Sequence, residues 1–270
     1  MSTPASRPLA LVTGASSGIG YELARLFAAD GHDLIITATT VEGLARTAAA
    51  VTAAGAEAIV VAADLTQYEG VETLAAAIKE TGRPLEAAAL NAGVGLGGYF
   101  VGGTDLAEEL NMIQLNTVSQ VHLTKRILPD MVARGAGKLL FTASISGTMP
   151  TPYETVYGAT KAFLISFAEA VKSEIKDSGV TITLLMPGQV DTKFWHRAHM
   201  DTSKLGLGEK AAPTKVASEG YEAMKAGKDR IVAGMTSSKF IGNVINNLAP
   251  DTVKADLHAK DARPDSGLEK

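Results

Sequence analysis

The sequence has no cysteine among its 270 residues. This absence excludes disulfides, cysteine-ligated zinc or iron–sulfur sites and a thiol nucleophile, and it fits a reducing compartment. Aromatic residues make up only 5% of the chain and charged residues only 20%, whereas 46% of the residues are hydrophobic. Such a chain is not disordered, and its core must be built mainly from Ala, Val, Ile, Leu and Met.

The chain also lacks an excess of positive charge and long apolar runs. Its formal net charge is −4 and the two signs are interspersed, so no basic stripe is available for a phosphate backbone. No window approaches the ~20 apolar residues of a membrane span, and the polar start over residues 1–8 does not have the pattern of a signal peptide. We therefore expect a soluble, cytoplasmic protein that binds neither nucleic acid nor membrane.

Short apolar runs alternate with helical patterns along most of the chain. Strands are predicted at 9–13, 33–38, 59–63, 87–91, 138–143, 181–186 and 230–233, and helices at 19–29, 41–54, 68–81, 106–128 and 152–175. Uninterrupted apolar strands are buried on both faces, and strands separated by helices pair in parallel. The pattern predicts an α/β fold: one Rossmann-like, doubly wound parallel sheet of about seven strands, with helices on both faces.

This single domain is expected to span residues 1–250, and the charged segment 251–270 is expected to be a polar surface tail. The apolar residues between Phe240 and Leu248 have helical spacing. They predict an amphipathic helix that packs on the core or on another subunit rather than on a membrane, because basic residues do not line its polar face.

A glycine-rich turn joins the first strand to the first helix. Gly14, Gly18 and Gly20 enclose Ser16, Ser17 and Ile19. Ligands of open α/β sheets bind beyond the carboxyl ends of the strands, where a helix N-terminus attracts phosphate and glycine allows close backbone approach. The turn therefore predicts a bound dinucleotide, with a tight structural turn as the other interpretation.

The same residues also match the G-x-S-x-G nucleophile elbow of serine hydrolases, with Ser16 as the nucleophile. An elbow needs an earlier strand loop as oxyanion donor, and only thirteen residues precede Gly14. The later histidines, His196, His199 and His258, stand in a predicted loop and in the polar tail. The context therefore disfavours this alternative.

The end of the second strand bears on the choice of cofactor. Ala38 is followed by Thr39 and Thr40, so no acidic residue is present to hold the ribose hydroxyls of NAD. No arginine is present either, but the hydroxyls of Ser17, Thr39 and Thr40 can donate to a phosphate. The sequence thus favours NADP over NAD.

Two residues on the predicted helix 152–175 have the spacing of an acid–base pair. Tyr157 and Lys161 are four residues apart and so share one helix face. A nearby ammonium favours the phenolate, so we expect Lys161 to lower the pKa of Tyr157 toward the operating range of a general acid. Ser144 follows the fifth strand at the ligand edge of the sheet, and Asn116 stands in the middle of a helix, where Asn is unfavourable unless its side chain is hydrogen-bonded.

Together these motifs resemble the short-chain dehydrogenase/reductase family, in its shorter oxidoreductase branch. They occur in order between Leu9 and Phe194: the glycine turn, Asp64-Leu65, Asn91-Ala92-Gly93, Asn116, Ser144, Tyr157 with Lys161, and Pro187-Gly188 with Thr192. The missing charged residue after the second strand is the departure from the family pattern, and it bears on the cofactor's phosphate alone.

The resemblance implies a role for each matching position. Gly14, Ser16, Ser17, Gly18, Ile19 and Gly20 would hold the pyrophosphate and adjacent ribose, Asp64 and Leu65 the adenine, Asn91, Ala92 and Gly93 would pack beside the cofactor, and Val190 and Thr192, after Pro187 and Gly188, would hold the nicotinamide carboxamide. Tyr157 would exchange a proton with the substrate oxygen, and Ser144 would orient that oxygen. Lys161 would bind the nicotinamide ribose, and Asn116 would hold a water that links Lys161 to solvent.

The implied activity is hydride transfer between NAD(P) and a small carbonyl or secondary alcohol. The first alternative is a catalytically silent dinucleotide sensor or scaffold, which would not need to keep Tyr157; a sugar-nucleotide epimerase is disfavoured by the glycine spacing. The family also implies a homodimer or homotetramer formed by the long helices. No metal is expected, since His196 and His199 lack a third ligand, and Phe194 and Trp195 form either a lid over the substrate or part of the core.

Overall fold

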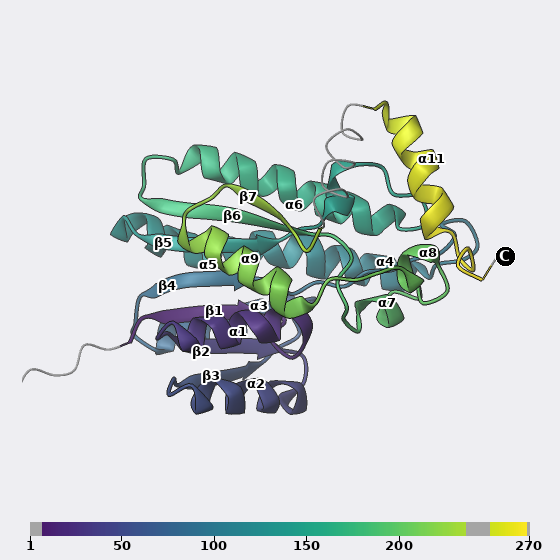
Figure 1. Ribbon diagram of the computed structural model, residues 1–270. Coiled ribbons are helices and arrows are strands. Elements are labelled where there is room, and N and C mark those ends of the chain that lie inside the picture. Colours follow the sequence, from purple (N-terminus) through teal and green to yellow (C-terminus); the bar gives the residue numbers. More distant parts are fainter. Residues whose placement is uncertain (1–6, 236–248, 269–270) are drawn as a thin grey trace, which may run out of the picture.

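A single parallel sheet of seven strands forms the centre of the molecule (Figure 1). This computed structural model describes residues 7–235 and 249–268. The strands are β1 (Leu9–Thr13), β2 (Asp33–Ala38), β3 (Ala58–Ala62), β4 (Leu85–Leu90), β5 (Gly137–Thr142), β6 (Val180–Pro187) and β7 (Arg230–Ala233). They are arranged in the order β3-β2-β1-β4-β5-β6-β7, and every neighbouring pair is parallel. The predicted fold class is confirmed.

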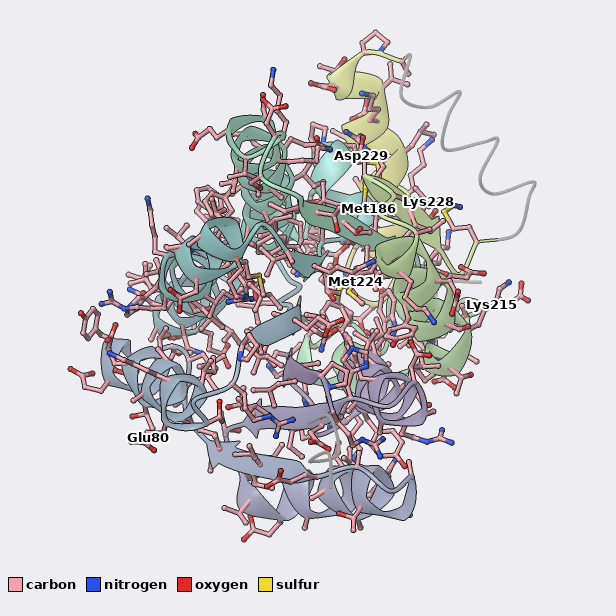
Figure 2. The ribbon with its side chains drawn as sticks, turned by 90° about the vertical axis from the view of Figure 1, so that its left-hand side faces the viewer. Glu80, Met186, Lys215, Met224, Lys228 and Asp229 are labelled. Atoms are coloured by element: carbon pink, nitrogen blue, oxygen red, sulfur yellow. The ribbon has the colours of Figure 1, made fainter. Side chains whose placement is uncertain are left out.

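Helices cover both faces of the sheet, as Figure 2 shows from the side. The first layer consists of α1 (Gly18–Ala29), α2 (Val41–Ala53) and α9 (Pro213–Lys225), and the second of α3 (Tyr68–Glu80), α5 (Ser119–Arg134) and α6 (Thr155–Glu174), with α4 (Leu106–Ile113) packed on α6. Each layer packs on one side of the strands and forms its own core. Met224 of α9 is buried in the first of these cores and Met186 of β6 in the second.

The strand order places the site. The chain winds outward from β1 to β3 and then returns to β4 on the other side of β1, so the direction of winding reverses between β1 and β4. At such a reversal the two loops that leave the strands diverge and open a crevice at the carboxyl edge. The loops after β1 and β4 carry the glycine turn and Asn91-Ala92-Gly93.

The long helix predicted at 106–128 is divided in the structure. Between α4 and α5 the segment Gln114–Val118 forms a π-helix, which contains the buried Asn116. The hydroxyls of Thr117 and Ser119 donate to the carbonyls four residues earlier. Wider turns of this kind occur frequently at functional sites, and hydrophobic periodicity does not signal them.

The segment after β6 contains two short helices, α7 (Phe194–Arg197) and α8 (Lys204–Leu207), above the carboxyl edge. Within the segment 251–270, expected to be a polar surface tail, residues Asp251–Ala262 form helix α11, which lies beside α8 (Figure 1). Ala262 packs with Trp195, Ala198 and Met200, so apolar contacts with α7 hold the end of α11 in place.

The amphipathic helix predicted between Phe240 and Leu248 lies outside the described residues. Within the described ranges, no helix combines the length and apolar character that crossing a membrane requires.

Candidate active site

A cavity of about 290 Å³ opens at the carboxyl edge of the sheet. Residues predicted for catalysis and for cofactor binding meet along its wall: Gly14, Ser16, Ser17, Gly18, Ile19, Asn91, Ala92, Gly93, Ser144, Tyr157, Lys161, Pro187, Gly188, Val190 and Thr192. They come from the loops after β1, β4, β5 and β6, from the start of α1, the end of β6 and from α6. Motifs that are far apart in the sequence therefore lie together on one continuous surface.

Glycine brings the backbone segments of this wall close together. Gly14 has a φ of +65°, and a Cβ atom there would lie 2.9 Å from Cα of Ala92. Gly18 has a φ of +57°, and its Cβ atom would lie 3.0 Å from the Thr192 side chain. Both values explain why the turn needs glycine: the conformation is left-handed and the neighbouring loop leaves no room for a side chain.

Thr13, the last residue of β1, ties the glycine turn to the loop after β4, and sequence reasoning missed it. Its Oγ1 accepts hydrogen bonds of 2.9 Å from the backbone N–H groups of both Asn91 and Ala92. The Asn91 side-chain amide in turn donates to the carbonyl of Thr13 over 3.2 Å. A threonine at the end of a strand is a common residue, so the sequence carries no signal for this contact.

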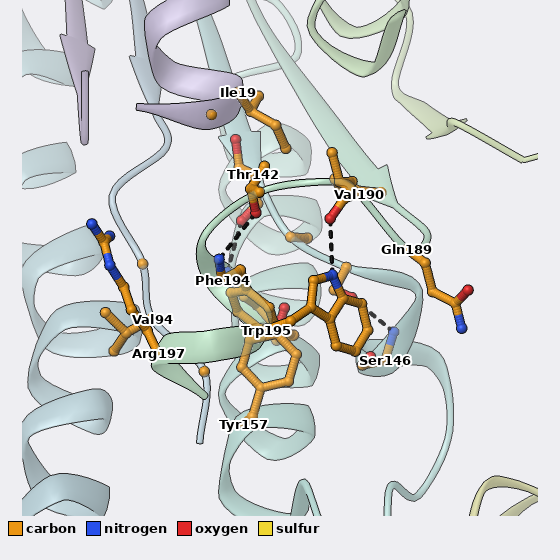
Figure 3. Close-up of a pocket in the computed structure, with 18 of the residues that line it drawn as sticks. Ile19, Val94, Thr142, Ser146, Tyr157, Gln189, Val190, Phe194, Trp195 and Arg197 are labelled. Atoms are coloured by element: carbon orange, nitrogen blue, oxygen red, sulfur yellow. Dashed lines mark hydrogen bonds between the residues drawn. The ribbon is translucent and has the colours of Figure 1, made fainter. Parts of the chain in front are cut away.

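Tyr157 and Lys161 share one face of α6, as predicted, and both are buried. The ammonium nitrogen of Lys161 lies 5.7 Å from the centre of the Tyr157 ring and donates a 2.9 Å hydrogen bond to the carbonyl of Thr142. The Tyr157 ring packs against Phe194, which in turn contacts Trp195 (Figure 3).

The expected depression of the Tyr157 pKa is wrong for this structure. Burial raises the pKa of Tyr157, the negative charge of Glu154 raises it further, and the side chain of Ser144 only partly opposes that rise. Burial also lowers the pKa of Lys161 from its ordinary value to about 8. The prediction weighed the ammonium alone, whereas removal from water disfavours the charged form of both groups.

Ser144 and Asn116 are the other two residues predicted for the catalytic set. Ser144 caps the short helix Ile145–Thr148, because its Oγ accepts from the N–H of Ser146 over 3.1 Å. The Asn116 amide binds both backbone groups of Val94 and donates to Thr160 of α6 over 3.1 Å. Asn116 therefore fixes the loop after β4 against α6, which explains its place in the middle of a helix.

Six predicted site residues are absent from the cavity wall: Gly20, Thr39, Thr40, Asp64, Leu65 and Asn116. Gly20 lies within α1, where a Cβ atom would meet the carbonyl of Gly14 at 2.2 Å. Thr40 caps α2 by accepting from Gly43, and Asp64 accepts from both the N–H and the hydroxyl of Thr66. Gly20, Thr40 and Asp64 therefore shape the loops after β1, β2 and β3 respectively.

The alternative that made Ser16 a nucleophile gains no support from its surroundings. Ser16 faces α2, where a Cβ atom on Gly43 would meet the Ser16 Cβ at 2.8 Å. The histidine in the wall of the same cavity, His258, lies against Glu154 instead. His196 and His199 face Asp201 and Glu108 respectively, and no cluster suited to a metal occurs in the described part of the chain.

Trp195 is anchored in the wall rather than projecting from it. Its indole N–H donates a 2.9 Å hydrogen bond to the carbonyl of Val190, and the ring is buried (Figure 3). Val94 and Met149 also line the cavity, whereas Leu96 and Tyr153 do not.

Known proteins with similar sequences are dehydrogenases and reductases. The family model for short chain dehydrogenases matches residues 8–202. Ketoacyl reductase HetN of Nostoc sp. is 33% identical over 180 residues, which is 67% of this chain and 62% of that protein. Sulfoacetaldehyde reductase 2 of Chromohalobacter salexigens is 31% identical over 187 residues, 69% of this chain and 74% of that protein.

Solved structures extend the likeness over more of the chain. A short-chain dehydrogenase from Sphingobium yanoikuyae in complex with NADPH superposes with a TM-score of 0.78 at 27% identity, covering 88% of this chain and 92% of that one. A short chain dehydrogenase/reductase from Burkholderia phymatum in complex with NAD has the same TM-score at 25% identity, covering 90% and 94%. The two relatives are in complex with different nicotinamide cofactors.

Proposed function

The chain belongs to the short-chain dehydrogenase/reductase family of NAD(P)-dependent oxidoreductases, and from that premise we propose that it reduces a carbonyl compound to an alcohol with NADPH. The observation that carries this proposal is the meeting of Tyr157, Lys161 and Ser144 in one cavity with the glycine turn. A catalytically silent dinucleotide-binding protein would not need a buried tyrosine and lysine there.

The residues around the cavity fit a dinucleotide. The glycine turn at the N-terminus of α1 offers unpaired N–H groups to a pyrophosphate, and Gly93 leaves a gap that a Cβ atom would fill at 3.1 Å from Asn116 and 3.3 Å from Lys161. In our proposal Gly14, Ser16, Ser17, Gly18, Ile19 and Gly20 hold the pyrophosphate and ribose, Asp64 and Leu65 the adenine, Asn91, Ala92 and Gly93 flank the cofactor, and Val190 and Thr192, after Pro187 and Gly188, hold the carboxamide.

NADP is proposed over NAD. β2 ends at Ala38 without a carboxylate, so no negative charge there repels a ribose phosphate. The hydroxyls of Thr39 and Ser17 are neutral donors for that phosphate, while Thr40 already caps α2.

The proposed chemistry is general acid catalysis by Tyr157. A bound nicotinamide supplies the hydride. Tyr157 is protonated at neutral pH, because its pKa is raised, and it can give this proton to the carbonyl oxygen of the substrate. Ser144 orients that oxygen, and Lys161 holds the nicotinamide ribose and stabilises the phenolate left on Tyr157. Asn116 positions Val94 and keeps a lone pair of Oδ1 for the water predicted beside Lys161.

We also propose a homodimer or homotetramer. Leu110 and Val118 on the α4–α5 segment and Phe163 on α6 are exposed apolar side chains. Size-exclusion chromatography with light scattering measures the mass of the assembly and so tests this proposal.

Replacement of Tyr157 by phenylalanine tests the mechanism. Tyr157→Phe removes one hydroxyl from a buried ring, so the fold and NADPH binding should persist while the reduction of ketones falls by about 10²–10⁴-fold. Turnover is measured from NADPH absorbance and binding from NADPH fluorescence. Tyr153→Phe, whose ring lies outside the cavity wall, is the matched control and should keep its activity. Undiminished turnover in Tyr157→Phe contradicts the mechanism.

A further inference from the structure

The cavity contains a second pair of titratable residues, Glu154 and His258, that the proposed hydride transfer does not use. Glu154 precedes the first residue of α6, and His258 comes from α11. Nε2 of His258 lies 3.0 Å from Oε2 of Glu154, and the two side chains are only 7% and 5% exposed. Both residues line the cavity together with Tyr157.

The C-terminal segment is fixed where it delivers His258. Ala262 packs with Trp195, Ala198 and Met200. The hydroxyl of Ser266 accepts from the N–H of Lys204 over 3.0 Å, and the N–H of Gly267 donates to the carbonyl of Thr202 over 2.9 Å. His258 is therefore part of a packed wall rather than a side chain of a free tail.

The pair is costly in this position. Its neighbours in the wall include apolar side chains of Met149, Phe194, Trp195 and Leu205, and burying two polar side chains among them costs free energy that apolar residues at the same positions would not cost. The charge of Glu154 also helps to raise the pKa of Tyr157. A role in binding accounts for both costs.

The geometry also leaves hydrogen-bonding capacity unused. Nε2 of His258 is buried and, despite its short distance to Glu154, forms no well-directed hydrogen bond. Buried polar atoms without a partner are rare and call for an explanation. A group that donates to the carboxylate and accepts from an imidazole N–H would satisfy both residues together.

A hydroxyl group meets both requirements. A second carbonyl on the substrate lacks the donor, an ammonium lacks the acceptor, and a carboxylate would be repelled by Glu154. We propose that Glu154 and His258 bind a hydroxyl group of the substrate, so that the preferred substrates are hydroxyketones and hydroxyaldehydes. This inference rests on the proposed reductase function.

The spacing along α6 limits where that hydroxyl stands. Glu154 occupies the N-cap position of α6 and Tyr157 is the third residue of that helix, so the two side chains leave the same turn of backbone. A substrate that contacts both must carry its hydroxyl a few bonds from the reacting carbonyl, on the α or β carbon.

Pairs of isosteric ketones test this inference. Hydroxyacetone is compared with butanone, and diacetone alcohol with methyl neopentyl ketone, each with NADPH. At least one hydroxyketone should exceed its isostere in kcat/KM by about tenfold or more. In His258→Leu and Glu154→Leu this ratio should fall toward one through a higher KM for the hydroxyketone, with the KM for NADPH unchanged. Glu154→Gln, which keeps an acceptor, should retain part of the preference.

The matched control is His196→Leu, because the His196 side chain is 86% exposed and lies outside the cavity wall. It should keep the wild-type ratio. Equal kcat/KM for both members of each pair in the wild type, or an unchanged ratio in His258→Leu, overturns the inference but leaves the reductase function intact.

NADPH oxidation by none of the four ketones would instead count against the reductase function. Binding then decides the inference: saturation-transfer NMR should detect hydroxyacetone or diacetone alcohol on the wild-type complex with NADP⁺ and lose the signal in His258→Leu. No signal with wild type, or an equal signal in both proteins, overturns it.

Discussion

The two sides of the cavity are formed by different parts of the polypeptide, backbone on one side and side chains on the other. On the side of β1 and β4, backbone approaches backbone: the glycine turn and the start of α1 define the surface, and the buried Thr13 ties them to the loop after β4. On the side of α7, α8 and α11, side chains define the surface, among them Phe194, Trp195, Leu205 and His258. The family match ends at residue 202, before α8 and α11 begin.

This contrast separates the part of the site that suits a ligand common to the family from the part that suits a ligand particular to one enzyme. A surface made of backbone N–H groups presents the same donors whatever the neighbouring side chains are, so it suits a ligand common to a family. A surface made of side chains changes with each substitution, so it suits a ligand particular to one enzyme. We therefore expect the side formed by the glycine turn (the glycine side) to tolerate few substitutions. The side formed by α7, α8 and α11 (the α11 side) should determine which substrate is bound.

The largest expected effect comes from a methyl group added on the glycine side. In Gly20→Ala the new Cβ would lie 2.2 Å from the carbonyl of Gly14 and 2.6 Å from the Asn91 amide. The backbone carbonyl of Gly14 cannot move without opening the glycine turn, so we expect a loss of about 3 kcal/mol of unfolding free energy and a large loss of NADPH affinity. Urea denaturation measures the unfolding free energy, and NADPH fluorescence measures the affinity for NADPH.

Gly82→Ala is the control, since Gly82 has a φ of +61° but no atom within 4 Å of the added Cβ. It should cost about 1–2 kcal/mol from backbone strain and leave NADPH affinity unchanged. Equal effects of the two substitutions would mean that close packing in the glycine turn is not what holds the cofactor side together.

The same contrast explains how far the sequence predicts the site. Strands, glycine turn and the Tyr157–Lys161 face follow from local patterns, and the structure confirms the strands and the fold. The π-helix around Asn116, the tie through Thr13 and the pair of Glu154 with His258 depend on contacts between distant segments. Glu154 and His258 are 104 residues apart, and polarity alone suggested a tail where α11 packs against the site.

Lys161 is buried in the wall of the cavity, and its burial predicts a pH-dependent stability. Its folded-state pKa of about 8 lies below its ordinary value of 10.5. Between these values the unfolded chain binds the additional proton, so the unfolding free energy of the wild type should rise with pH. The folded protein must bury a costly ammonium below this range.

Lys161→Met removes this cost. At pH 7 the variant should be more stable than the wild type by about 1–3 kcal/mol, and it should lack the rise between pH 8 and 10 while losing reductase activity. Denaturation curves at several pH values test this. Parallel pH dependence of the two proteins would contradict the burial of a charged Lys161. Lys172→Met, at a half-buried lysine of α6 whose ammonium pairs with Glu169 and Asp229, controls for the loss of one positive charge.

The smallest effect should come from a change at the end of β2 that leaves the glycine turn intact. In Ala38→Asp a carboxylate would meet the ribose hydroxyls of NADH and repel the phosphate of NADPH, so the ratio of the two dissociation constants should shift toward NADH by about tenfold. Thr39→Arg should shift the ratio the other way. Fluorescence titration measures both. An unchanged ratio in Ala38→Asp would place the ribose elsewhere. A changed preference between hydroxyacetone and butanone in the same variant would break the separation of the two sides, because Ala38 lies outside the cavity wall that contains Glu154 and His258.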